Sequence, residues 1–239
     1  DHCLGLAGMS QRISLDRVPH PVHVYFPGSG RVYYDRLRRA SIYHEAAEMV
    51  AHPLETEGVI HSDERIQLET KRLDHGVETF GYRLVEHDGV TMMPEKLEAA
   101  GIRGRNLGEI QRKGETTIDG VVHRAADYSV PKLGQSVAFV MDTRICDGAY
   151  ELAKNVDMLI CESTYLNSEA KEARENGHMT AAQAATIARD SGAKFLVLTH
   201  FSQRYTSTQP FVEEAREIFP NVVAAKDTKR YAIAKREGQ

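Results

Sequence analysis

The second half of the chain alternates strand-like segments with helix-like segments, and this alternation constrains the fold more than any other feature. Short apolar runs predict strands at residues 137–141, 158–161, 195–198, 222–225 and 231–234. Between them, helical patterns cover residues 148–155, 180–190 and 209–218. Thr180 is a good N-cap for the second of these helices, because its hydroxyl can accept a backbone N–H of the first turn. Strands that alternate with helices predict an α/β architecture.

The first half of the chain adds further elements and one irregular stretch. We expect helices at residues 4–14 and 32–43, and strands at 22–26, 66–73 and 80–85. Residues 94–127 show a weaker pattern, in which a short helix is followed by glycines and basic side chains. We therefore predict that this stretch is a protruding basic insertion outside the core.

Composition excludes several classes of protein. The chain has 239 residues, of which 41% are hydrophobic and 27% are charged, so it can bury a substantial core and is neither collagen-like nor disordered. Its longest apolar runs are far shorter than the about 20 residues of a membrane helix, no signal peptide is recognisable, and we expect no membrane partner. The net charge of −4 means that any nucleic-acid binding depends on local basic patches.

The three cysteines, Cys3, Cys146 and Cys161, form no Cys-x-x-Cys pair. An odd number without such spacing argues against a disulfide framework and against a thiolate zinc site. A reducing cytoplasm is the simplest location for such a chain.

Polar residues that can bind metals follow three of the predicted strands. These strands lead into Asp74-His75, into Asp142 and into His200, and Asp1-His2 precedes the first helix. Sites in α/β sheets gather at the carboxyl ends of strands. A single histidine after a strand is more often a hydrogen-bonded structural residue, but the recurrence favours a metal site. Histidines and carboxylates without thiolates suit Zn²⁺, with Mn²⁺ or another divalent ion as alternatives.

Four segments together resemble one known family. Residues 1–8 (DHCLGLAG) look like the second half of the His-x-His-x-Asp-His motif of the metallo-β-lactamase superfamily, and their Leu-Gly-Leu-x-Gly continuation resembles its ribonuclease Z branch. Residues 73–83 (LDHGVETFGYR) are similar to the third motif, Asp142-Thr143 to the bridging-aspartate motif, and residues 198–205 (LTHFSQRY) to the last motif. The segments follow the family's order over nearly the whole chain.

The resemblance implies a fold and also a gap at the start of the chain. The family fold is an αββα sandwich of two mixed sheets flanked by helices. Residues 1–239 would form one such domain that is N-terminally truncated, because the His-x-His pair expected before Asp1 is absent. The first sheet would be incomplete, since its N-terminal strands are missing.

The same resemblance implies a two-zinc site in the complete subunit. Asp1, His2 and His200 would be ligands of one zinc, His75 would be a ligand of the other, and Asp142 would bridge the two. Asp1 would in addition orient the attacking water or accept its proton. A carboxylate shared by two ions suits a two-metal hydrolytic site. Without the His-x-His pair, this chain would hold its second ion weakly.

A proton donor is implied by two further motifs. Residues 161–164 (CEST) resemble the family's His-Glu-Ala-Thr loop, and residues 178–180 (HMT) resemble its His-Ser-Thr loop. His178 would protonate the leaving oxygen, and Glu162 would orient His178; a neutral-range pKa suits histidine for this work. Alternatively, His178 could be a surface histidine before a helix, and Glu162 could be a buried hydrogen-bonded carboxylate.

Substrate contacts are expected at two places. Close after His200 come Ser202, Arg204 and Tyr205. Arginine suits a phosphate, and tyrosine can stack on an unpaired base. Both side chains could instead hold the following loop in place. The insertion 94–127 falls where the family carries a flexible arm that grips tRNA. Its basic residues would contact phosphates without reading sequence, unless they form only a solvated charged loop; they are Arg103, Arg105, Arg112 and Lys113.

The function that the resemblance implies is removal of the 3′ trailer from precursor tRNA by a zinc-dependent endoribonuclease, which leaves a 3′-hydroxyl on the tRNA. A cytoplasmic homodimer, in which one subunit's arm holds the tRNA that the other cuts, is implied as well. Two alternatives remain at this point. The chain could be another phosphodiesterase or esterase of the same fold, or an inactive, metal-poor fragment that binds RNA.

Overall fold

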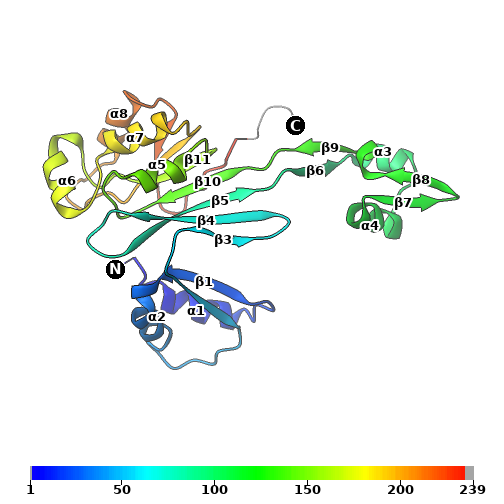
Figure 1. The fold of residues 1–239 in the computed structure, drawn as a ribbon, viewed down its shortest axis with the longest axis horizontal. Coiled ribbons are helices and arrows are strands. Elements are labelled where there is room, and N and C mark those ends of the chain that lie inside the picture. The colour runs from blue at the N-terminus through cyan, green and yellow to red at the C-terminus, as the bar shows by residue number, and fades with distance from the viewer. Residues whose placement is uncertain (1, 235–239) are drawn as a thin grey trace.

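The computed structural model describes residues 2–234, and it consists of four layers and a projecting arm (Figure 1). Two helices lie outside a small sheet, a large mixed sheet packs against the other side of that small sheet, and further helices cover the outer face of the large sheet. This order of helices, sheet, sheet and helices is the expected αββα arrangement. Among the described residues, no helix is both long and apolar enough to cross a membrane.

The large sheet has seven strands in the order β13-β12-β11-β10-β5-β4-β3. Strands β10 to β13 are parallel, whereas β5 is antiparallel to both of its neighbours, β10 and β4. Strand β4 therefore runs in the same direction as β10, and the carboxyl ends of β4, β10, β11 and β12 meet at one edge. The strands are β3 (Gly58–Ser62), β4 (Ile66–Leu73), β5 (Thr79–Glu86), β10 (Ser136–Val140), β11 (Met158–Glu162), β12 (Leu196–Thr199) and β13 (Val222–Ala224).

The small sheet consists of two parallel strands, β1 (Val22–Pro27) and β2 (Met49–Leu54). Helices α1 (Leu6–Leu15) and α2 (Arg31–Arg38) lie on its outer side, and the short 3-10 turn η1 (Gly28–Gly30) connects β1 to α2. The helix expected at 32–43 ends early, because the amides of Arg39 and Ala40 bond to carbonyls only three residues back.

Helices α5 (Asp147–Ala153), α7 (Ala181–Asp190) and α8 (Gln209–Arg216) cover the outer face of the large sheet. They form the main core with apolar side chains of β10 to β13. The expected N-cap is present: the Thr180 hydroxyl accepts the Gln183 amide, and the Gln183 side chain accepts the Thr180 amide in return. This capping box fixes the point at which the chain enters α7. Before it lie η3 (Asn167–Glu169) and α6 (Ala170–Asn176).

The arm extends away from the body on a two-stranded ribbon, β6 (Gly89–Met92) paired with β9 (Ser129–Lys132) (Figure 1). At its end lie α3 (Pro94–Ala99), α4 (Gly104–Lys113), the hairpin β7 (Glu115–Ile118) with β8 (Val121–Arg124), and η2 (Ala125–Tyr128). These elements take no part in the main core. Leu97, Ile102 and Ile110 are buried and form a small core of their own, so the arm's end is a folded lobe.

The strand expected at 231–234 is wrong. Tyr231 instead packs back on the chain, where its hydroxyl donates to the Ala224 carbonyl and accepts the Lys226 amide. The carbonyls of Ile233 and Ala234 accept hydrogen bonds from the Gln135 side-chain amide rather than from a neighbouring strand.

Candidate functional site

The candidate site lies at the edge where the parallel strands of the large sheet end. Asp142 follows β10 and His200 follows β12, while Glu162 is the last residue of β11 between them and pairs with Thr199. Asp142 and His200 both have left-handed backbone conformations, with φ of 53° and 59°. Non-glycine residues adopt this region at a cost of ~1–3 kcal/mol, and such strain concentrates at functional sites.

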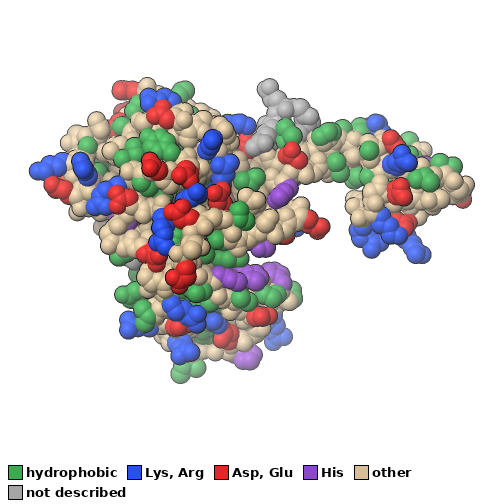
Figure 2. Space-filling model, in the orientation of Figure 1, with side chains coloured by type: hydrophobic (Ala, Val, Ile, Leu, Met, Phe, Trp, Pro, Cys, Tyr) green, Lys and Arg blue, Asp and Glu red, His purple; other side chains and the backbone are tan. Residues whose placement is uncertain are grey.

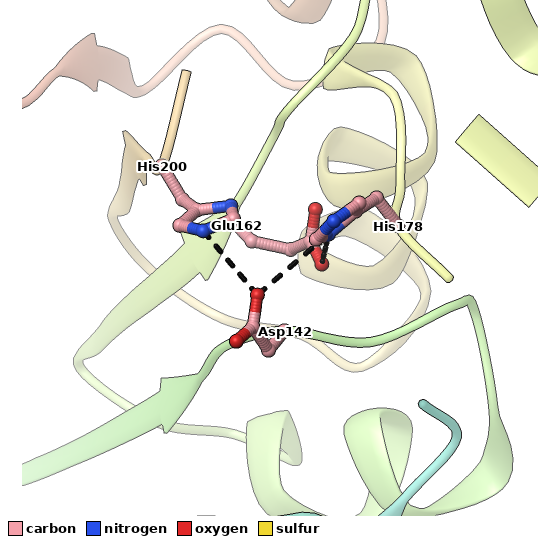
Figure 3. A group of neighbouring side chains, drawn as sticks. All are labelled: Asp142, Glu162, His178 and His200. Atoms are coloured by element: carbon pink, nitrogen blue, oxygen red, sulfur yellow. Dashed lines mark hydrogen bonds and ion pairs between the residues drawn. The ribbon is translucent and has the colours of Figure 1, made fainter. Parts of the chain in front are cut away.

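Four side chains converge there: Asp142, Glu162, His178 and His200 (Figure 3). Each offers a ligand atom, and these atoms all lie within 4.8 Å of one another. His178 comes from the loop before α7, whose entry the capping box fixes. Chain segments far apart in the sequence thus bring two imidazoles and two carboxylates to one place.

His2 completes a set of donor atoms around Asp142. Its Nε2 lies 2.9 Å from one Asp142 carboxylate oxygen and 3.0 Å from the Nε2 of His200, which in turn lies 3.3 Å from the other Asp142 oxygen. Ligands of a tetrahedral Zn²⁺ are separated by about 3.3 Å, so these three residues fit a divalent ion. Asp1, the fourth expected ligand, lies outside the described residues.

Glu162 is fully buried and accepts four hydrogen bonds. One oxygen accepts the Thr143 amide at 2.6 Å and His178 Nδ1 at 3.1 Å; the other accepts the Thr164 hydroxyl at 2.6 Å and the Met179 amide at 3.0 Å. Burial alone would raise the pKa of Glu162, but these hydrogen bonds outweigh it and lower the pKa. With both oxygens occupied in this way, Glu162 organises the site and is a poor metal ligand.

Thr164 connects Glu162 to His200. Its hydroxyl donates to the carboxylate, which can only accept, and lies 2.7 Å from Nδ1 of His200. A hydroxyl has one hydrogen, so Thr164 must accept a hydrogen bond from Nδ1–H. The lone pair of His200 is then on Nε2, which faces Asp142 and His2. Burial lowers the pKa of His200, with the nearby histidines adding to the effect, and this shift favours the neutral imidazole that a metal ligand requires.

His178 differs from His200 in its electrostatic environment. Its hydrogen bond to Glu162 raises the pKa of His178, and burial only partly offsets this rise. Its Nδ1 lies 3.1 Å from the Glu162 carboxylate but 3.7 Å from Asp142. The surroundings therefore shift the pKa values of the two imidazoles in opposite directions, down for His200 and up for His178.

His75 lies beside this group without belonging to it. Its Nδ1 is 2.9 Å from the Gly177 carbonyl, and its ring centroid is 5.3 Å from that of His178. Gly177 has a φ of +84°, and a Cβ there would lie 2.6 Å from His75 Nδ1, so a larger residue would displace the imidazole.

The residues after His200 are committed to contacts within the chain. Arg204 forms an ion pair with Glu169 at 2.6 Å and stacks over the Tyr165 ring. The Tyr205 hydroxyl accepts the Leu166 amide, and its ring packs on Phe211. The Ser202 amide donates to the Thr164 carbonyl. These contacts favour the structural alternative for Arg204 and Tyr205.

The four basic residues of the arm all lie on or beside α4 and are exposed. Figure 2 shows a group of blue side chains on the lower surface of the arm's lobe. Lys113 forms an ion pair with Glu109 one helical turn back. The four exposed basic residues of the arm are Arg103, Arg105, Arg112 and Lys113.

A pocket of about 780 Å³ adjoins the site, and sequence reasoning missed most of its lining. His178 lies in its wall; the other lining residues are Asp74, Arg144, Ile145, Ala170, Lys171, Arg174 and Gln183. Arg144 follows the bridging-aspartate motif directly, which was an available signal. Lys171 and Arg174 lie on α6, and nothing in the sequence links this helix to the site.

Comparison with known proteins gives a consistent result. Residues 35–201 match the family model described as "Beta-lactamase superfamily domain". The chain is 53% identical to a ribonuclease Z of Salinispora arenicola over 219 residues, which are 92% of this chain and 71% of that protein. It is 43% identical to a ribonuclease Z of Chlamydia trachomatis over 235 residues, 98% of this chain and 77% of that protein.

A solved structure supports the fold assignment. The short form of human tRNase Z is similar with a TM-score of 0.64 and 24% identity, over 96% of this chain and 74% of that one.

Proposed function

This chain belongs to the ribonuclease Z family of the metallo-β-lactamase superfamily and is accordingly a tRNA 3′-processing endoribonuclease, and we propose how its site performs this hydrolysis. The observation that carries the proposal is the pairing of a metal-competent group with a separate imidazole, His178, whose hydrogen bond to Glu162 raises its pKa. These two features are what cleavage of a phosphodiester requires: stabilisation of charge on the phosphate, and a proton for the leaving oxygen.

The residues that would hold metal are Asp142, His200 and His2, with Asp1 as a further ligand. His75 would serve a second ion beside Asp142. Nitrogen and carboxylate donors without thiolates fit Zn²⁺, and Mn²⁺ is an alternative. A divalent ion here would lower the pKa of water and offset charge that develops on the phosphate oxygens. Thr164 supports this role by keeping the lone pair of His200 on Nε2.

His178 would deliver the proton. Glu162 accepts from Nδ1, so in the protonated ring the second proton is on Nε2, the atom available to substrate. In hydrolysis that leaves a 3′-hydroxyl on the tRNA, the leaving atom is O3′ of the last tRNA nucleotide. Glu162 stabilises the imidazolium before the transfer and fixes the ring's orientation throughout.

The arm, residues 94–127, would hold the tRNA away from the cleavage site. Its exposed basic residues at α4 suit contacts with the phosphate backbone, which position RNA without reading sequence. The arm extends outward from its own body (Figure 1), which supports a homodimer in which each arm serves the other subunit's site. Processing of tRNA also supports a cytoplasmic location.

The test compares two substrates, precursor tRNA and bis-p-nitrophenyl phosphate, in one zinc-loaded preparation. We expect cleavage of the precursor to a tRNA with a 3′-hydroxyl. Removal of residues 94–127 should weaken precursor binding, whereas the small ester needs no arm.

Each alternative function has its own outcome in this test. Turnover of the small ester alone would support a different phosphodiesterase or esterase. RNA binding with one zinc or none, and without cleavage, would support an inactive fragment.

A further inference from the structure

The pocket beside His178 is positively charged, and of its lining residues the proposed hydrolysis uses His178 alone. Among residues 2–234, three of the lining side chains are cationic, namely Arg144, Lys171 and Arg174, and Asp74 is the one carboxylate. Asp74 forms an ion pair with Arg144 at 3.2 Å. The wall therefore keeps a net positive charge, which favours an anionic ligand.

Arg144 is held in a fixed orientation in this wall. Its Nε donates to the Arg174 carbonyl at 2.6 Å, and one terminal nitrogen contacts Asp74. These two bonds use only part of the five-donor guanidinium, and its other terminal nitrogen has no acceptor among residues 2–234. An arginine that is fixed in this way, with donors to spare, is well suited to bind a phosphate.

Lys171 and Arg174 lie one helical turn apart on α6. The only ion pair of Lys171 in the described part of the chain is a long one of 3.9 Å to Glu175, and the Arg174 guanidinium has no partner there. The Gln183 side chain uses its oxygen to accept the Thr180 amide, which leaves its NH₂ group as a donor. Cations and donors around a pocket of about 780 Å³ match the size and polarity of a nucleotide site.

The position of His178 indicates which nucleotide this is. His178 lines the pocket and, under the proposed function on which this step depends, protonates O3′ of the last tRNA nucleotide. The nucleoside that carries O3′ must then lie against His178. We propose that the pocket binds the last nucleotide of the tRNA, and that Arg144 and Arg174 bind the phosphate on its 5′ side.

Direct binding measurements test this without relying on catalysis. The two probes are an acceptor-stem hairpin that ends at this nucleotide with a 3′-hydroxyl, and a trailer oligonucleotide with a 5′-phosphate. The protein is the full chain with Zn²⁺ added. Arg174→Ala should weaken hairpin binding about tenfold, as expected for loss of one charge-assisted contact. It should also reduce the salt dependence, the slope of log K against log[salt], by about 0.7 to 0.9.

Two further variants keep the result interpretable. Arg174→Lys should retain most of the affinity, because the charge remains. Arg216→Ala removes an exposed arginine from the last turn of α8, outside the pocket, and should leave both affinities unchanged.

The proposal is overturned if Arg174→Ala leaves hairpin binding unchanged, if it weakens binding of the trailer instead, or if Arg216→Ala weakens the hairpin equally. If the wild-type chain fails to cleave precursor tRNA, the proposed function is refuted. The binding measurements do not depend on cleavage, so they show separately whether the pocket proposal fails.

Discussion

Replacement of Glu162 by glutamine tests how the centre of the site is held together. The carboxylate is fully buried and each of its oxygens accepts two hydrogen bonds. A glutamine fits the same space, but its NH₂ end cannot accept. Whichever way the amide is oriented, one backbone N–H, that of Thr143 or that of Met179, loses its acceptor, and His178 loses the negative charge that it faces.

The magnitude follows from the backbone N–H left without an acceptor and from the lost charge. Each buried donor without a partner costs ~1–3 kcal/mol, and removal of one member of a buried charged network costs ~3–5 kcal/mol. We therefore expect Glu162→Gln to lower the free energy of unfolding of the metal-free chain by about 3–5 kcal/mol. Urea unfolding at pH 7, followed by circular dichroism, measures this.

Glu217→Gln is the matched control. Glu217 is an exposed glutamate beyond the last turn of α8, so its substitution should change the free energy of unfolding by less than about 0.5 kcal/mol. If Glu162→Gln costs no more than this control, then the four hydrogen bonds do not hold the site together and the reasoning is refuted.

Three other predictions concern separate parts of the molecule. Thr164→Val removes the hydroxyl that fixes the tautomer of His200, so it should lower zinc affinity about 10–100-fold in chelator competition. The control Thr186→Val loses only a hydrogen bond to the Ala182 carbonyl and should leave zinc affinity unchanged. Equal zinc affinities of the two variants would contradict the tautomer argument. Burial raises the pKa of the Cys161 thiol well above its usual value, so Cys161 should react with a thiol reagent only after unfolding. The exposed Cys3 should react at once. Rapid modification of Cys161 in the native chain would refute its burial. The backbone amides of Ile66 and Arg65 donate hydrogen bonds to the Asp63 carboxylate and lower its pKa to about 2. The contribution of Asp63 to stability is therefore complete above about pH 4 and is lost as the pH falls through 2. An NMR titration midpoint near 3.8 would be inconsistent with these hydrogen bonds.

Which residues lie at the carboxyl ends of the strands could be predicted from the sequence, because the end of a strand is visible in the local sequence pattern. An apolar run that stops at Asp142 or His200 indicates both the strand and the polar residue that follows it. Parallel pairing then brings these ends together by topology. The resemblance added the proposed roles of His178 and Glu162, which lie 16 residues apart and yet are hydrogen-bonded.

Other features depend on contacts that the sequence does not display. Strand β2 contains His52 and Pro53, which interrupt its apolar pattern, and it went unpredicted. Helix α6 reads as a charged surface segment, and its position beside His178 results from packing: the His178 amide donates to the Ala173 carbonyl. The contacts of Arg204 with Glu169 and Tyr165 are likewise tertiary.

The most direct test of the central claim, that His178 supplies the leaving oxygen with its proton, uses a precursor tRNA in which sulfur replaces the bridging O3′ at the cleavage site. A thiolate leaves without protonation, because thiols are far more acidic than alcohols. We predict that His178→Ala, with unchanged zinc content, cleaves the normal precursor about 10²–10⁴-fold more slowly than the wild type but cleaves the sulfur-containing precursor at nearly the wild-type rate. Equal slowing on both substrates would contradict the account.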